Sequence, residues 1–478
     1  MVLKPRADVK KVASRLKKKG YIIKSLKIPD FSCIYANFSV PLHRLWNRED
    51  RNVRLFIIGS MNMYKFCLRV CVIAFIALSI VSCGKKTPYA NDMPLLHVSG
   101  EYVLTEAGDT FYIQGVNLGC WLNPEGYMFM MPNGVCNSPR MINDLFSQLV
   151  GPDEAAAFWE TFKDRYVTEE DIRFIASTSA NTVRLPFHYA LLTDEDYLGR
   201  TTREGFARLD SAVSWCKRYG LYVVLDMHDC PGGQTGDNID DSYGYPFLFV
   251  SPAAQDKFCS LWREIAAHYE NENAVLGYEM MNEPVAPYFA QDLDTLNDIL
   301  EALYARCIDS IRSVDQRHII IPGGAQWNGN FKVFTGRIHD DNLLYACHRY
   351  HHSSDEQGIR DFLNFRDSLH VAMCMTETGH ETYQWLQEEA ATLKRNHIGL
   401  LWWPYKKMGG SCWMQVGTPD TWNVVRDFAA SDRQTYAAVR SNRPPVETAR
   451  RALEDYLDSI RFVHCRPDTV YVNTLTPM

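Results

Sequence analysis

The sequence of 478 residues contains no apolar run near the roughly 20 residues that a membrane-spanning helix requires, which excludes a polytopic membrane protein. It has no Walker phosphate-binding loop, and no GxGxxG turn follows an early β-rich run, which disfavours a dinucleotide-binding open sheet. The ten cysteines after Cys83 form no CxxC pair, so the spacing typical of a zinc site is absent. With 46% hydrophobic and 22% charged residues, the composition is that of a globular protein with a large core.

One shorter apolar run, VCVIAFIALSIV at 70–81, follows the basic residues Lys65 and Arg69. A charged start, a short apolar centre and a small-residue exit predict a secretory signal peptide rather than a spanning helix. The exit, Ile80-Val81-Ser82-Cys83, resembles the bacterial lipobox, in which the cysteine is acylated. We therefore expect an exported chain, lipid-anchored through Cys83 to a bacterial membrane at its periplasmic face or at the cell surface. The alternative is a plain signal peptide that is cleaved nearby.

The segment 1–60 is long, basic and without clear periodicity, unlike the few residues that precede the apolar part of a signal peptide. We interpret it as a disordered over-extension of the reading frame, with Met61 or Met63 as the start. A functional basic arm is the alternative. The signal peptide then occupies 61–83, a polar tether 84–96, and a single domain 97–478.

The chain after Cys83 is strongly acidic. Residues 1–83 hold 16 of the 50 basic and 4 of the 57 acidic residues, which leaves 34 basic and 53 acidic residues and a net charge of −19. Such a surface repels phosphate backbones, so we expect no nucleic-acid partner and a neutral or cationic substrate.

The acidic part alternates short β-rich runs with longer amphipathic ones. Residues 97–113 predict a hairpin around the turn 106–109, and helical periodicity is clear at 205–220, 257–270 and 296–314. Eight β-rich runs are predicted, beginning at Phe111, Asn181, Leu221, Ala274, His318, Leu343, Val371 and Ile398.

Strands that alternate with helices of this length imply right-handed βαβ units and a parallel sheet. Eight such units predict an α/β fold, a (β/α)8 TIM barrel in one domain, with the short N-terminal hairpin and a C-terminal helix at 447–463 that packs on the outside of the barrel. A doubly wound open sheet is the alternative.

Polar side chains lie within or at the end of six of the eight runs. They are Arg184 in the second run, His228 in the third, Asn282 and Glu283 in the fourth, His348 and Tyr350 in the sixth, Glu377 in the seventh and Trp403 in the eighth. One charged residue at a strand end is usually just solvated, but six strands together predict an active site. Two carboxylates, a cation, two imidazoles, an amide, a phenol and an indole suit protonation and displacement at a sugar carbon.

An ordered series of motifs resembles glycoside hydrolase family 5, the cellulase family. The motifs are GVNLGCWLNPEGYMF, NTVRLPFHY, DMHDCPGGQ, YEMMNEP, HRYHH, MTETG and LLWWPYKK, which together cover about 111–407. The resemblance implies a (β/α)8 barrel that hydrolyses β-linked glycans with retention of configuration and needs no cofactor or metal.

The resemblance also assigns roles. Glu283, in the Asn-Glu-Pro motif, matches the general acid/base and Glu377 matches the nucleophile. Retention independently requires two carboxyl groups about 5 to 5.5 Å apart. Six substrate-binding residues are implied: Arg184 as the cation that keeps the nucleophile ionised, Tyr350 as its phenol donor, Asn282 at the sugar 2-hydroxyl, His228 and His348 lining the reacting subsite, and Trp403 as the aromatic floor.

We therefore expect a monomeric retaining hydrolase that cleaves a β-1,4- or β-1,3-linked glucan by double displacement, in endo or exo mode. The glucan preference rests on the GVNLGCWL opening and on the Pro-Gly-Gly-Gln after His228. The alternatives are a hydrolase for β-mannan or another hemicellulose, a metal-dependent barrel hydrolase, and a surface glycan-binding lipoprotein without catalysis.

Other residues could compete for these roles. Glu381 lies close to Glu377 and could be the nucleophile, and the histidines of 348–352 could bind a metal, although an extended strand would direct them to different sides. Glu125 could contact sugar or have only a structural role in its loop. Five further tryptophans could stack on sugars, with packing as the default for each: Trp121, Trp327, Trp385, Trp402 and Trp413.

Overall fold

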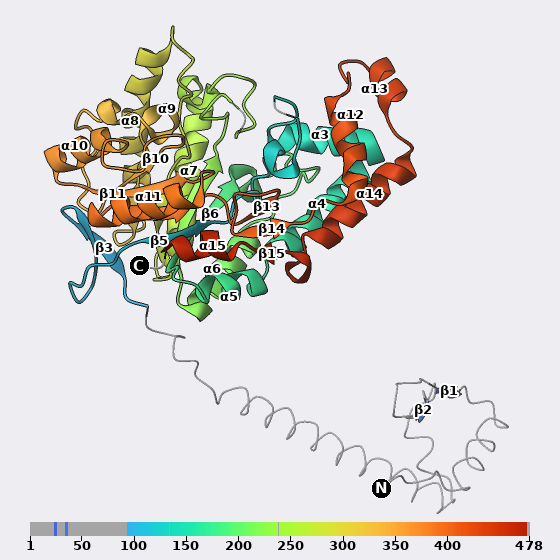
Figure 1. Cartoon of the computed structure of the whole chain (residues 1–478), viewed down its shortest axis with the longest axis horizontal. Coiled ribbons are helices and arrows are strands. Elements are labelled where there is room, and N and C mark those ends of the chain that lie inside the picture. The colour runs from blue at the N-terminus through green and yellow to red at the C-terminus, as the bar shows by residue number, and fades with distance from the viewer. Residues whose placement is uncertain (1–22, 26–33, 37–92, 133, 238, 476–478) are drawn as a thin grey trace, which may run out of the picture. The chain divides into compact units, whose positions relative to one another are not determined.

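The computed structural model describes residues 23–25, 34–36, 93–132, 134–237 and 239–475 (Figure 1). The chain divides into two compact units, Met1–Lys86 and Thr87–Met478. In the first unit, β1 (Ile23–Ser25) and β2 (Ile34–Ala36) form an antiparallel pair. The predicted signal peptide and Cys83, the predicted lipidation site, lie outside the described residues, together with most of the predicted extension and tether.

The second unit is built on an eight-stranded parallel sheet in the order β10-β11-β12-β5-β6-β7-β8-β9. Bridges from Ile320 to Leu343 and from Gly323 to Ala346 join β9 to β10 and close the sheet into a barrel. The eight predicted strands are confirmed as β5 (Gln114–Asn117), β6 (Thr182–His188), β7 (Tyr222–Asp229), β8 (Val275–Glu279), β9 (Ile319–Ile321), β10 (Leu344–His348), β11 (Ala372–Thr378) and β12 (Gly399–Trp402).

Helices surround this barrel, and the three predicted ones are confirmed as α6, α7 and α8 (Figure 1). The α-helices are α3 (Pro139–Val150), α4 (Pro152–Tyr166), α5 (Glu169–Ala176), α6 (Ala207–Tyr219), α7 (Pro252–Tyr269), α8 (Leu293–Arg312), α9 (Ala325–Asn328), α10 (Arg360–Leu369), α11 (Tyr383–Arg395), α12 (Asn423–Ala430), α13 (Tyr436–Asn442), α14 (Val446–Ser459) and α15 (Thr469–Val472). The 3-10 turns are η2 (Gly126–Phe129), η3 (Tyr189–Leu192), η4 (Phe247–Val250), η5 (Phe331–Val333), η6 (Asp420–Trp422), η7 (Phe462–His464) and η8 (Asn473–Leu475). Among the described helices, none is both long and apolar enough to cross a bilayer.

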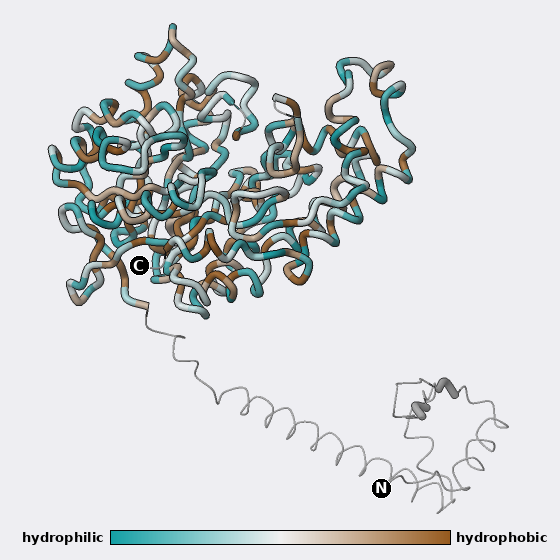
Figure 2. The backbone as a smooth tube through the Cα atoms, in the orientation of Figure 1, coloured by the Kyte–Doolittle hydropathy of each residue, from teal (hydrophilic) through white to brown (hydrophobic). Residues whose placement is uncertain are grey.

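The predicted C-terminal helix is α14, but it packs in a helical lobe beside the barrel rather than on the barrel wall. Its partners are α3, α4 and α12. Aromatic rings fill the centre of this lobe, where Trp422 stacks on Tyr456 at 4.6 Å and on Phe129 at 6.4 Å. In Figure 2, polar and apolar residues alternate along these helices, as expected for helices with one buried face.

The predicted hairpin exists, but its turn was misplaced. β3 (Leu96–Ser99) and β4 (Tyr102–Thr105) pair antiparallel around a two-residue turn at 100–101. Gly100 has a φ of 57°, in the left-handed region that such a turn requires and that glycine adopts without strain. The predicted turn at 106–109 is a second bend, after which Thr110 bridges to Leu104.

The hairpin contributes to the core at the amino-terminal ends of the barrel strands. Leu96 and Val103 are buried in one cluster with Val224, Ile319 and Leu401 of the barrel strands. This end of the barrel is therefore filled with apolar side chains, and the polar side chains concentrate at the opposite end.

Beyond β12 the chain forms a small sheet of β13 (Lys406–Met408), β14 (Met414–Val416) and β15 (Arg466–Pro467) and then returns to the carboxyl ends of the barrel strands. Tyr471 is buried there and donates a hydrogen bond from its hydroxyl to the Trp403 carbonyl at 3.3 Å. A Cβ atom on Gly379 would lie only 2.5 Å from that hydroxyl, so the segments that contain Gly379, Trp403 and Tyr471 are closely packed.

Candidate active site

Arg184, fully buried on β6, organises the carboxyl ends of the strands. Its Nη1 donates to Glu377 Oε1 at 2.6 Å, and its Nε and Nη2 donate to the two oxygens of Glu279 at 2.7 and 2.9 Å. Nη2 also donates to Asn282 Oδ1 at 2.8 Å. A planar guanidinium that is held on several sides fixes each partner in one orientation, so Glu377 and Asn282 are pre-positioned relative to one another.

The two glutamates that were predicted to react meet at the mouth of the barrel. One carboxylate oxygen each of Glu283 and Glu377 and a ring nitrogen of His348 all lie within 4.8 Å of one another. This separation suits attack by one carboxylate on a sugar that the other protonates, and it is shorter than the roughly 6.5 to 9.5 Å that an intervening water requires. The Tyr350 hydroxyl donates to Glu377 Oε2 at 3.1 Å.

Burial and charge set the ionisation of this group. Burial raises the pKa of Glu377 above its ordinary value, although His348 and Arg184 each lower it. We expected Arg184 to lower the pKa of this carboxyl, and its contribution has that sign, but burial outweighs it. Burial also opposes charge on His348, but Glu377 and hydrogen bonds to Glu279 and Glu283 raise its pKa to about 9.

Glu283 lies beyond β8, which ends at Glu279 and not at the Asn-Glu-Pro motif as predicted. Its φ of 45° is in the left-handed region, which costs a residue with a side chain about 1 to 2 kcal/mol. The loop after β7 holds it there, because Thr235 Oγ1 donates to the Glu283 carbonyl at 2.7 Å and Gln234 Nε2 donates to the Asn282 carbonyl at 2.8 Å. The orientation of the Glu283 carboxyl therefore depends on hydrogen bonds between the loop after β7 and the loop after β8.

An aromatic wall, formed by the stacked rings of Trp403 and His228, lies beside these groups. The Trp403 indole stacks on the His228 ring at 5.4 Å with only 4° between the planes, and its Nε1 donates to the Tyr127 hydroxyl at 2.5 Å. Burial lowers the pKa of His228 to about 4, so the ring is neutral near pH 7. Its Nδ1 lies 2.7 Å from Asp226 Oδ2.

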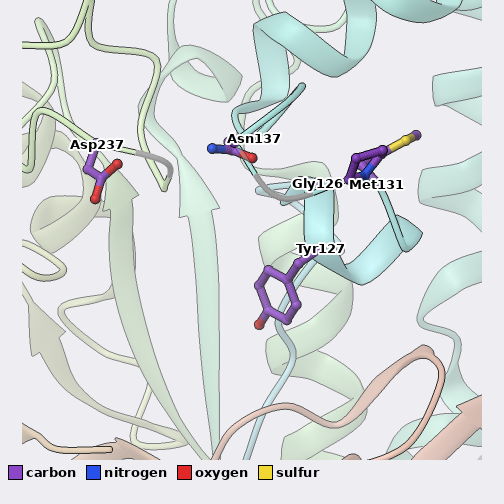
Figure 3. Close-up of a pocket in the computed structure, with 7 residues that line it drawn as sticks. Gly126, Tyr127, Met131, Asn137 and Asp237 are labelled. Atoms are coloured by element: carbon purple, nitrogen blue, oxygen red, sulfur yellow. The ribbon is translucent and has the colours of Figure 1, made fainter. Parts of the chain in front are cut away.

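A cavity of about 220 Å³ opens beside Tyr127, between the loops that follow β5 and β7 (Figure 3). Its lining is mostly polar backbone and side chains from residues Gly126, Tyr127, Met131, Pro132, Gly134, Asn137 and Asp237. Tyr127 joins this cavity to Trp403 through a hydrogen bond, and neither reacting glutamate lines it.

All eight residues predicted for the site are brought together, and several supporting residues were missed. Asp226 and Glu279 are fully buried partners of Arg184, with Asp226 Oδ2 3.0 Å from Nη2, and Asn117 Oδ1 accepts from Nη1 at 2.9 Å. Alternation along the strands could have found Asp226, because side chains two residues apart share a face and it precedes His228 by two. Glu279 could also have been found from the sequence, because a carboxylate inside an apolar run is unusual unless a buried partner binds it.

The competing residues lie elsewhere or in other roles. Glu381 pairs with the exposed His351 at 3.0 Å, away from the carboxylate pair. The histidines of 348–352 do not converge, since His352 Nε2 faces Glu389 at 3.3 Å. Glu125 is buried with Oε1 unpartnered and 3.9 Å from His228 Nε2, and burial raises its pKa well above the usual value, so it belongs to the site.

A second group with metal-ligand chemistry, His188 with Asp229 and Asp241, lies outside the carboxylate pair. His188 Nε2 is 3.1 and 3.2 Å from the two carboxylates, while Nδ1 accepts the Ala190 backbone N–H at 3.0 Å. Because Nδ1 accepts this hydrogen bond, a neutral ring carries its proton on Nε2, where it bonds the two carboxylates. The group therefore cross-links the β6 and β7 loops.

Comparison with known proteins agrees with this geometry. Residues 148–409 match the family model "Cellulase (glycosyl hydrolase family 5)". The chain is 31% identical over 260 residues to a beta-xylosidase of Phanerodontia chrysosporium, covering 54% of this chain and 52% of that protein. It is 32% identical over 188 residues to endoglucanase C of Acetivibrio thermocellus, covering 39% and 51%. It thus spans about half the length of these relatives.

The fold also recurs in a solved structure, a rutinosidase from Aspergillus niger. That structure superposes with a TM-score of 0.52 at 18% identity, over 63% of this chain and 91% of the other. An identity this low supports the shared barrel alone. The family match spans more than half of the chain and includes both glutamates, so this protein belongs to glycoside hydrolase family 5.

Proposed function

We propose that the protein is a retaining β-glycosidase that hydrolyses a β-linked glucan. The observation that carries this proposal is the carboxylate pair, because Glu283 and Glu377 approach within 4.8 Å across the barrel mouth. Their surroundings differ as two roles require: Arg184 and Tyr350 bind Glu377, whereas neither contacts Glu283.

The reaction follows in two displacements. The Glu377 carboxylate attacks the anomeric carbon while the bond to the leaving oxygen breaks and Glu283 donates its proton to that oxygen. A water then attacks the anomeric carbon, gives its proton to Glu283 and releases Glu377. The rings of Trp403 and His228 supply the stacking wall for the sugar, and Asn282 lies where it can reach the 2-hydroxyl.

A β-glucan is the substrate that we favour, because one matched relative is named an endoglucanase and the β5 and β7 loops carry the glucan-like motifs. The runner-up is a hemicellulose, which the beta-xylosidase relative supports. A glycan-binding protein without catalysis would not need two carboxylates at the separation that the retaining reaction requires. The monomeric state stays a prediction.

Product analysis tests the proposal directly. Purified protein is incubated with β-1,4-glucan, β-1,3-glucan, mannan and xyloglucan oligomers, and we expect shorter products from at least one glucan. Proton NMR during the first turnovers should show the β-anomer before mutarotation, since two displacements restore the configuration. Initial release of the α-anomer, or cleavage of mannan alone, would contradict the proposal.

We also propose that the protein is exported and anchored through an acylated Cys83, a residue outside the described part of the chain. The lipobox-like sequence supports this proposal. In a bacterial host fed labelled fatty acid, the parent should carry label and fractionate with membranes, whereas Cys83→Ala should lose the label. Cys67→Ala is the matched control and should keep it. Label that survives in Cys83→Ala would refute the anchor.

A further inference from the structure

The loop after β7 contains a buried carboxyl group that binds the backbone of its own loop. Asp240 is 1% exposed, and its Oδ2 accepts the backbone N–H groups of Thr235 at 2.7 Å and of Gly236 at 3.2 Å. Its Oδ1 accepts the backbone N–H of Ser242 at 3.2 Å. Hydrogen bonds from a side chain to nearby backbone groups fix the conformation of a turn. Asp240 therefore holds the turn at 235–236.

Close packing encloses the same turn. A Cβ atom on Gly233 would overlap the Ser242 side chain and would lie 3.1 Å from Asp240 Oδ2. A Cβ atom on Gly236 would lie 2.5 Å from the Phe289 ring. The turn is thus packed against Phe289 as well as bonded to Asp240, and it has one position in the folded chain.

The backbone around the predicted acid/base is bonded to this turn. Thr235 Oγ1 donates to the Glu283 carbonyl at 2.7 Å. In the other direction, the Ala286 N–H donates to the Thr235 carbonyl at 3.0 Å, and the Val285 N–H donates to the Gln234 carbonyl at 2.9 Å. Three hydrogen bonds therefore transmit the position of the turn to the segment that starts at Glu283.

That segment has a strained backbone. Glu283 and Val285 have φ values of 45° and 57°, so two residues with side chains are in the left-handed region, with Pro284 between them. Strain of this kind persists only where the surrounding structure over-determines it. If the turn moved, the segment could relax, and the Glu283 carboxyl would no longer face the leaving oxygen.

We infer that Asp240 is a positioning residue for the general acid/base, because it fixes the turn that in turn fixes the Glu283 backbone. This inference rests on the proposed function. The hydrogen bonds of Asp240 go to its own loop, so it acts on Glu283 through the turn. Glu377 is held separately by Arg184 on β6. Loss of Asp240 should therefore disturb the acid/base and spare the nucleophile.

The test compares two leaving groups in each variant. For a dinitrophenyl glycoside, kcat/KM reports formation of the glycosyl-enzyme without proton donation, whereas for a glucan oligosaccharide it also requires the acid. In Asp240→Ala, kcat/KM for the oligosaccharide should fall about tenfold, and that for the dinitrophenyl glycoside should stay within about twofold of the parent value. Asp240→Asn, whose amide oxygen can still accept from the turn, should recover part of the loss.

A second variant and a control separate positioning from a general loss of structure. Thr235→Val removes the hydroxyl that binds the Glu283 carbonyl, and it should show the same unequal loss. Glu301→Ala is the matched control, because Glu301 is also 1% exposed and accepts three backbone N–H groups, each at 2.9 Å, from the turn at 335–337. Its ratio of the two kcat/KM values should equal that of the parent.

Circular dichroism checks that each variant folds, and Asp240→Asn and Thr235→Val decide the question if Asp240→Ala does not. A fall by the same factor for both substrates, or no fall for either, would overturn the inference while the proposed function stands. A parent that hydrolyses neither substrate would overturn the proposed function first, and this inference with it.

Discussion

Replacing Glu377 with alanine is expected to lower turnover of a glucan oligosaccharide on the order of 10⁵-fold, because no other carboxylate is placed to form the glycosyl-enzyme. Arg184 keeps two further carboxylate partners, Asp226 and Glu279, so the fold should survive the loss of this one. Circular dichroism and the thermal midpoint check that point, and initial rates with the oligosaccharide measure the loss.

The stereochemistry of rescue makes this prediction sharper. With an activated aryl glycoside, azide can enter the space that Glu377→Ala vacates and attack once, which gives a glycosyl azide of inverted configuration. Glu381→Ala is the matched control, since Glu381 pairs with the exposed His351, and it should retain parent turnover. Near-parent rates in Glu377→Ala, or their loss in Glu381→Ala, would show that the nucleophile was assigned wrongly.

The pH dependence of the parent enzyme is a second test of the role of Glu377. Burial raises the pKa of Glu377. Since only the ionised carboxylate attacks, kcat/KM should decline as the pH falls through this raised pKa, at a higher pH than for an ordinary glutamate. An acid limb at the usual carboxyl position would contradict this account of Glu377.

Replacing Glu283 with alanine should produce a loss that depends on the leaving group. For an oligosaccharide, whose alkoxide leaves poorly, the rate should fall about 10³-fold because the proton donor is gone. For a dinitrophenyl glycoside, which leaves without a proton, formation of the glycosyl-enzyme should be nearly unimpaired, and hydrolysis should become the slow step.

Azide distinguishes this variant from the first. In Glu283→Ala, Glu377 attacks first and azide second, so the glycosyl azide should have the configuration of the substrate. The two variants are thus controls for one another, because they should give opposite anomers. The same loss for both leaving groups, or an inverted azide, would exclude Glu283 as the acid/base.

The barrel could be predicted from sequence because its strands are buried on both faces, so each is a short apolar run. In six of the eight runs, polar residues within or at the end of the run also indicated the site. The hairpin turn was harder, since Glu106-Ala107-Gly108-Asp109 is more polar than the true turn at Gly100. The partners of α14 could not be inferred, because an amphipathic pattern tells which face is buried and not what covers it.

The predicted site residues came from motif order, and the structure brings them together. The charged residues that hold them in place were not predicted. The role of a carboxylate such as Glu279 becomes clear only when the structure shows that it binds Arg184. Burial opposes the charge on Glu279, but Arg184 and His348 lower its pKa to about 2, so it stays ionised. The partial exposure of Trp327, at 36%, could not be predicted either, because the left-handed backbone at 326–328 has no sequence signature.

The contact between Tyr471 and Trp403 links the order of synthesis to the order in which the enzyme is completed. Both glutamates and all eight barrel strands are translated before Tyr471, whose hydroxyl binds the Trp403 carbonyl and fills the space beside Gly379. A nascent chain that has just finished β12 already carries both glutamates, but Trp403, the proposed stacking residue, does not yet have Tyr471 packed behind it. The packing around the site is therefore completed last, when the segment that includes α15 packs against Trp403.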